Sequence, residues 1–217
     1  MKSGILLDVD GTLWDAVKAI TESWNEYTRK FIPEVPGPFT DQDIQDVLGK
    51  TMLEIVDILY PGLSGERKQE VIGGIMQYEV DYLSEHAGVV YPGVAETVRR
   101  LKMDGYHLYI VSNCQKGYIE DFLKASELED AIEDHVCFGD TLKSKDFSIR
   151  LCAERNHLDR ALYVGDTAGD LSATRKAGFP FIYAAYGFGS VDAGKEKVER
   201  IGTFAELPDA VKRVWGE

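Results

Sequence analysis

The sequence has few cysteines and no long hydrophobic run. Its three cysteines, Cys114, Cys137 and Cys152, form no C-x-x-C pair and are odd in number, which argues against a disulfide framework and a structural zinc site. Such sparse cysteine use is typical of a reducing compartment. No charged and then apolar leader opens the chain, and no apolar run approaches the length that spans a bilayer. We therefore expect a cytoplasmic protein that does not bind membranes.

Positive charge is also scarce. The chain has 24 Lys and Arg residues against 37 Asp and Glu residues, which gives a formal net charge of −13 at pH 7. A polyanion would repel this surface, so non-specific binding to nucleic acid or to acidic membranes is not expected. A small anionic substrate can still bind at a local positive site. No feature of the sequence indicates an oligomeric state.

The 217 residues, 44% of them hydrophobic, suffice for a real core. An apolar strand-like run, Ile5 to Leu7, opens the chain, and the next strand-like run starts only about a hundred residues later, at His107. The intervening patterns have helical spacing, at residues 16–31, 52–59 and 71–82. After them, strand-like and helical patterns alternate, which is typical of a parallel sheet. The strands are expected at 107–111, 135–138, 161–164 and 179–184, the helices at 119–123, 149–153, 171–177 and 204–214.

A crossover between parallel strands needs only a dozen or two residues, so the long gap after the first strand indicates an insertion. We predict an α/β fold with a Rossmann-like three-layer parallel sheet core, residues 1–15 and 88–217. Residues 16–87 are predicted to form an inserted α-helical cap domain. The cap would lie over the carboxyl edge of the sheet, where ligands of open α/β sheets bind.

Chemically active side chains follow several of these strands. Parallel strands end at one edge, so the side chains should converge there. They are Asp8, Asp10, Ser112, Asn113, Asp166 and Asp170, with Lys143 and Lys145 in a nearby loop. Such a set offers oxygen ligands for Mg²⁺, a hydroxyl and a cation for a phosphate, and a carboxylate that can attack phosphorus.

Four segments resemble, in order, the four motifs of the haloacid dehalogenase superfamily. They are Asp8-Val9-Asp10-Gly11-Thr12-Leu13, Ile110-Val111-Ser112-Asn113, a lysine in the next-but-one loop, and Val164-Gly165-Asp166-Thr167-Ala168-Gly169-Asp170. With helices inserted between the first two motifs, the chain resembles the helical-cap branch, which includes phosphoglycolate phosphatases. The resemblance implies an Mg²⁺-dependent phosphatase that hydrolyses a small phosphorylated metabolite, a phosphomonoester such as phosphoglycolate, through an aspartyl-phosphate intermediate.

The resemblance also implies a role for each motif residue. Asp8 would be the nucleophile, and Asp10 would protonate the leaving alcohol and then deprotonate the attacking water. Mg²⁺ would be held by Asp8, the backbone carbonyl of Asp10, and Asp166, with Asp170 orienting a ligand or a metal-bound water. The phosphoryl oxygens would be held by Ser112, by the amides of Asn113 and Gly11, and by Lys143.

Two lysine assignments have alternatives. The family commonly has Lys-Pro in its third motif, whereas this chain has Lys143-Ser144-Lys145-Asp146. An ungapped alignment of the following helix favours Lys143, and Lys145 is the alternative. Lys50, between two cap helices, could bind a carboxylate or second phosphate of the substrate, or could belong to a solvated turn.

Two other functions fit the same motifs. Sugar-phosphate mutases use the same core. A helical-cap mutase of this kind has a histidine ten residues after its second aspartate, where this chain has Ile20, which weighs against a mutase. A non-catalytic sensor could bind phosphometabolites with the same residues.

Overall fold

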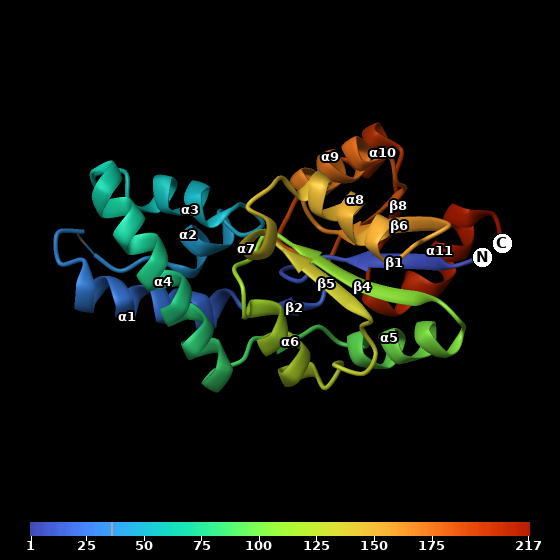
Figure 1. Ribbon diagram of the computed structural model, residues 1–217, viewed down its shortest axis with the longest axis horizontal. Coiled ribbons are helices and arrows are strands. Elements are labelled where there is room, and N and C mark those ends of the chain that lie inside the picture. Colours follow the sequence, from blue (N-terminus) through green and yellow to red (C-terminus); the bar gives the residue numbers. More distant parts are fainter. Residues whose placement is uncertain (36) are drawn as a thin grey trace.

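A six-stranded parallel sheet forms one end of the molecule in the computed structural model, which describes residues 1–35 and 37–217 (Figure 1). The strand order is β5-β4-β1-β6-β7-β8. The strands are β1 (Ser3–Leu7), β4 (His107–Ser112), β5 (Asp134–Cys137), β6 (Arg160–Gly165), β7 (Phe181–Ala184) and β8 (Glu199–Ile201). β1 lies between β4 and β6, and all five of its residues are buried. Strands buried on both faces are typical of parallel sheets covered by helices.

Helices cover both faces of the sheet, as the alternation of side chains along each strand requires (Figure 1). Ile5 and Leu7 of β1 belong to the hydrophobic cluster on one face, and Leu6 belongs to the cluster on the other. The first face packs against α5 (Val94–Met103), α6 (Tyr118–Ser126) and α11 (Leu207–Trp215), the second against α8 (Lys145–Arg155) and α9 (Ala168–Ala177). The predicted three-layer α/β core is confirmed.

Four of the helices between β1 and β4 gather at the opposite end of the molecule (Figure 1). They are α1 (Val17–Phe31), α2 (Asp41–Gln45), α3 (Met52–Leu59) and α4 (Gly65–Glu85). Capping boxes at Thr40 and Thr51 start α2 and α3, and the Ser64 side chain caps α4. We call these four helices the cap. Its boundaries at residues 16 and 87 stay a prediction.

The two connections between the cap and the core pair with each other. β2 (Trp14–Asp15) and β3 (Val89–Val90) form a two-residue antiparallel ribbon, with Trp14 opposite Val90 and Asp15 opposite Val89. The sequence patterns do not predict these strands, because two residues are too few to show a period. The patterns also miss four other short elements: α2, α7 (Phe138–Thr141), β8 and α10 (Ala193–Glu196).

Cap and core meet where α4 packs against α6. Gly117 has a φ of +95°, and a Cβ atom there would lie 3.0 Å from Val80 Cγ1. A glycine therefore permits this close approach. Among the described residues, no helix is long and apolar enough to cross a membrane.

Candidate active site

The carboxyl ends of three neighbouring strands bring the predicted site residues together. Leu7 of β1 pairs with Ile110 of β4 and with Val164 of β6, so the segments that follow these residues start side by side. Asp8 is anchored by its backbone N–H, which donates to the Val164 carbonyl at 2.9 Å. Ser112 ends β4, and Asp166 follows β6 directly.

Lys145, and not Lys143, supplies the ammonium of this site. Lys145 Nζ lies 2.8 Å from Asp8 Oδ1 and 2.5 Å from Asp170 Oδ1, and its side chain is only 5% exposed. Lys143 is exposed, two residues before α8 begins. Its preceding residue, Leu142, has a φ of +52°. The expectation that Lys143 reaches the phosphate is therefore not met. The first turn of α8 directs Lys145 inward instead.

Asp8, Asp166 and Asp170 form a buried group of acids that could hold a divalent cation. One carboxylate oxygen from each lies within 4.8 Å of the others. Asp166 Oδ1 is buried and accepts no hydrogen bond from the described residues. Burial and the Asp170 charge raise the pKa of Asp8 to about 6 and that of Asp166 to about 8. An unpaired oxygen among hard carboxylate donors is the environment that Mg²⁺ prefers, so these residues fit the ion.

A single lysine compensates part of this negative charge. Burial by itself would lower the pKa of Lys145, but the Asp170 and Asp8 carboxylates hold it well above its usual value. Both carboxylate oxygens of Asp170 accept hydrogen bonds, and Oδ1 accepts from Lys145. Its Oδ2 accepts from the Thr167 backbone N–H at 3.0 Å and the Thr167 hydroxyl at 2.7 Å, in the capping box of α9. Asp170 thus orients Lys145 while starting α9.

Asp10 is held by two donors on one oxygen. Its Oδ1 accepts from Trp14 Nε1 at 3.1 Å and from the Tyr118 hydroxyl at 2.5 Å. Burial raises the pKa of Asp10 to about 7, although the Tyr118 hydrogen bond opposes the rise. A carboxyl that titrates near neutral pH can both give and take a proton.

The lack of a side chain at Gly11 leaves room for Asp166, and the Gly11 amide is engaged within the backbone. Its N–H donates to the Trp14 carbonyl at 3.0 Å, so the expectation that this amide holds a phosphoryl oxygen is not met. Its φ is +74°, and a Cβ atom would lie 2.2 Å from Asp166 Oδ2. That same oxygen accepts from the N–H groups of Phe188 and Gly189, at 2.8 and 2.9 Å. The loop after β7 therefore fixes Asp166, a role that the sequence patterns did not indicate.

Ser112 and Asn113 lie at the edge of the site. Ser112 Oγ accepts from the Cys114 N–H at 3.4 Å. The Asn113 side chain donates to the Gly49 carbonyl of the cap at 2.8 Å, so its amide group holds the neighbour of Lys50 against the core. Lys50 lines a cavity that Asp8 and Asp10 also line. Its contact with a substrate stays a prediction.

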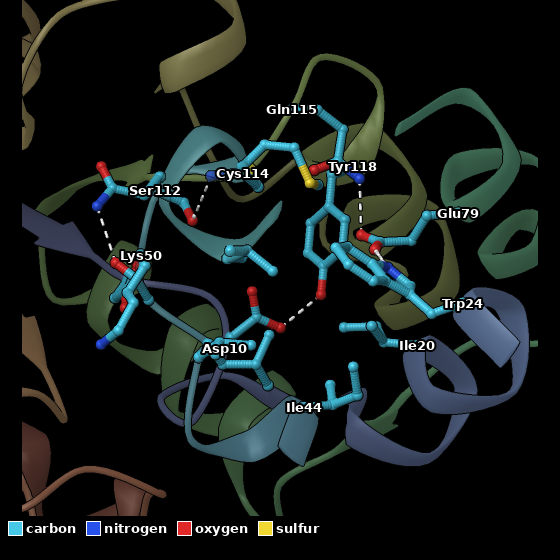
Figure 2. Close-up of a pocket in the computed structure, with 17 residues that line it drawn as sticks. Asp10, Ile20, Trp24, Ile44, Lys50, Glu79, Ser112, Cys114, Gln115 and Tyr118 are labelled. Carbon is cyan, nitrogen blue, oxygen red and sulfur yellow. Dashed lines mark hydrogen bonds between the residues drawn. The ribbon is translucent and has the colours of Figure 1, made fainter. Parts of the chain in front are cut away.

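A cavity of about 40 Å³ extends from Asp8 and Asp10 into the cap (Figure 2). Its wall includes Ile20, Trp24, Ile44 and Tyr118, and also Glu79. Figure 2 shows Tyr118 reaching Asp10, and Glu79 beside Trp24 at the side of the cavity away from Lys50.

Glu79 and its donors were missed by the sequence patterns. Trp24 Nε1 donates to Glu79 Oε2 in a short hydrogen bond, and Gln115 Nε2 donates to Oε1 at 2.7 Å. Burial raises the pKa of Glu79, and the two hydrogen bonds oppose the rise. A signal was present in the sequence, because Glu79 interrupts the apolar row Val71, Ile75 and Leu83 at intervals of four residues.

Residues 5–184 match the family model described as haloacid dehalogenase-like hydrolase. The chain belongs to this family. The haloacid dehalogenase-like chain is 29% identical over 196 residues to a phosphoglycolate phosphatase of Nitrosospira multiformis, covering 85% of this chain and 83% of that protein. It is 26% identical to a phosphoglycolate phosphatase of Cereibacter sphaeroides, and the match covers 97% of this chain and 98% of that protein. The predicted resemblance to phosphoglycolate phosphatases is thereby confirmed.

Solved structures show the same fold. A predicted phosphatase from Clostridium acetobutylicum superposes with a TM-score of 0.81 and 22% identity, covering 98% of this chain and 99% of that one. The match covers nearly the whole chain, so the likeness in fold includes the cap helices as well as the sheet.

Proposed function

We propose that this hydrolase is an Mg²⁺-dependent phosphatase that cleaves a small phosphomonoester through a phosphoryl group transiently bonded to Asp8. The observation that most directly supports this proposal is the buried group in which Lys145 lies between Asp8 and Asp170, with Asp166 beside them. The two phosphoglycolate phosphatase relatives support a phosphate ester as the substrate, with phosphoglycolate as the first compound to test. Free cysteines support a cytoplasmic location.

In the first half-reaction, an Asp8 carboxylate oxygen attacks phosphorus and the bond from phosphorus to the ester oxygen breaks. Asp10 gives its proton to the departing alkoxide, a task for which a pKa near 7 is suited. Trp14 and Tyr118 bind one Asp10 oxygen, so they fix the direction of the other. In the second half-reaction, ionised Asp10 takes a proton from the water that attacks phosphorus, the bond from phosphorus to the Asp8 oxygen breaks, and inorganic phosphate leaves.

Lys145, with its ammonium against Asp8, holds the nucleophile in place and offsets the negative charge that a phosphate adds. Asp8, the backbone carbonyl of Asp10, and Asp166 would hold Mg²⁺. When bound, the ion supplies positive charge that reduces the repulsion between a phosphate dianion and the carboxylates. The Ser112 hydroxyl, with Asn113, would face the phosphoryl oxygens.

The proposal is tested by hydrolysis of p-nitrophenyl phosphate with and without Mg²⁺. Wild-type protein should turn over the ester only with the ion, and Asp8→Asn should be inactive because the amide cannot attack phosphorus. Asp41→Asn is the matched control, since Asp41 is an exposed acid of α2. A phosphometabolite sensor would hydrolyse nothing in any form. Given a sugar phosphate as substrate, a mutase would return an isomer of it instead of inorganic phosphate.

A further inference from the structure

Glu79 is a buried carboxylate with hydrogen bonds but no cationic partner among the described residues. It is 4% exposed, and its two oxygens accept from the uncharged indole of Trp24 and the uncharged amide of Gln115. Each oxygen therefore has one donor and can accept another, and neither donor compensates the negative charge. Burying an uncompensated charge is costly, so a structural acceptor at this position would be better provided by a neutral glutamine.

The carboxylate lies in the wall of the same cavity as the proton donor Asp10 (Figure 2). The surroundings are apolar and aromatic, with Ile20 and Trp24 of α1 and Tyr118 of α6. The alcohol of a phosphomonoester must extend away from phosphorus on the side of Asp10, because Asp10 protonates its oxygen. The cavity of about 40 Å³ exceeds the ~15 Å³ that one water requires, so it accommodates a group of a few non-hydrogen atoms.

Charges divide the cavity into two sides. Lys50 is at the side of Ser112, where the phosphate would lie, and Glu79 is at the other side (Figure 2). The leaving group therefore meets a negative charge in an apolar setting, where a charge interaction is stronger than in water. A carboxylate on the alcohol would be repelled there, and an ammonium would be attracted.

We propose that Glu79 is a specificity-determining residue that selects phosphomonoesters whose small alcohol carries an ammonium group. The ammonium donates a hydrogen bond to a Glu79 oxygen, and the Trp24 and Tyr118 rings provide aromatic surface that favours a cation. This inference rests on the proposed phosphatase function and refines its substrate class.

Three esters of similar size test the proposal: 2-aminoethyl phosphate, propyl phosphate and phosphoglycolate. They place a cation, a methyl group and an anion at the same end of the alcohol. Wild-type kcat/KM should decrease in that order. In Glu79→Gln, kcat/KM for 2-aminoethyl phosphate should fall by about 10- to 100-fold, the range for a hydrogen bond to a charged group. The value for propyl phosphate should change by less than about threefold, and that for phosphoglycolate should rise.

A purely structural Glu79 would give a different result, because Glu79→Gln would then change kcat/KM for all three esters by one common factor. Wild-type protein that prefers phosphoglycolate to 2-aminoethyl phosphate also overturns the inference, and this comparison needs no variant. If p-nitrophenyl phosphate is hydrolysed in either case, the phosphatase function stands and only the specificity is wrong. If wild-type protein hydrolyses no ester, the phosphatase function fails and the specificity with it.

Discussion

Replacing Lys145 tests the centre of the site, because this side chain serves both the reaction and the fold. Its ammonium lies 2.8 Å from Asp8 and 2.5 Å from Asp170, with 5% of the side chain exposed. Lys145→Ala leaves two buried carboxylates without their cation. Removing one partner of a buried ion pair costs about 3–5 kcal/mol. For chains of this length, each kcal/mol lowers Tm by about 2–4 °C, so Tm should fall by about 6–20 °C.

Activity should fall further than stability alone explains. Loss of one preorganised donor to the reacting group lowers kcat by about 10²–10³-fold. Both effects are measured on Lys145→Ala and on Lys145→Met, which keeps most of the apolar stem, by thermal melting and by p-nitrophenyl phosphate hydrolysis well below Tm. Because the remaining carboxylates repel each other, Mg²⁺ should raise the Tm of both variants more than that of wild-type protein.

Lys143→Ala is the matched control, since Lys143 lies two residues away and is exposed. A surface substitution of this kind changes stability by about 0.5 kcal/mol at most. Its kcat should stay within about twofold of wild type by the same reasoning. The reasoning is refuted if Lys143→Ala loses as much activity as Lys145→Ala, or if Lys145→Ala keeps its kcat.

Two further substitutions address the proton donor and the pH dependence of stability. Tyr118→Phe removes a hydroxyl that binds Asp10 at 2.5 Å, so kcat should fall about tenfold with little change in KM, as initial-rate kinetics would show. Burial opposes ionisation of Asp134, but bonds from Asn156 and Arg155 hold its pKa below the usual 3.8. Its ionised form therefore stabilises the fold above pH ~4, and this contribution is lost as pH falls through the lowered pKa. The Tm deficit of Asp134→Asn should be largest near neutral pH and disappear in acid.

A specific result would contradict each of these two predictions. Tyr60→Phe is the control for Tyr118, because its hydroxyl pairs with Thr28 inside the cap at 2.6 Å. If Tyr60→Phe lowers kcat as strongly, the Asp10 contact is not the cause. A Tm deficit of Asp134→Asn that stays constant between neutral and acid pH would show that packing, and not charge, is responsible.

The sheet and three of the four motifs could be predicted because each rests on a local pattern. Short buried strands with acids at their ends are visible in the sequence, and parallel pairing then brings those ends together. Asp8 and Asp166 are examples, since each directly follows a strand whose residues are buried, apart from Arg160 at the start of β6. The two-residue β2 and β3 have no detectable period and form only because their partners meet in the folded chain.

The lysine could not be assigned in this way. Ile149, Cys152 and Ala153 are buried as the helical pattern requires, yet this pattern does not fix where α8 begins. Ser144 is at the N-cap position, so Lys145 is the first residue of the helix, and its side chain is buried. Glu79 was missed for another reason. A glutamate in an apolar row is ordinarily exposed at the edge of a helix, and its burial depends on Trp24 and Gln115, which are distant in sequence.

The ribbon of β2 and β3 has a consequence for how proteins of this kind diversify. The chain leaves the sheet through Trp14–Asp15 and returns through Val89–Val90, and these two segments are paired side by side. The segment between them is thus an insertion whose two ends stay paired, whatever its length or composition. Evolution, or an engineer, can exchange the cap for another inserted segment without disturbing the strand register that positions Asp8. Substrate preference and phosphate chemistry can accordingly be inherited as separate parts of one gene.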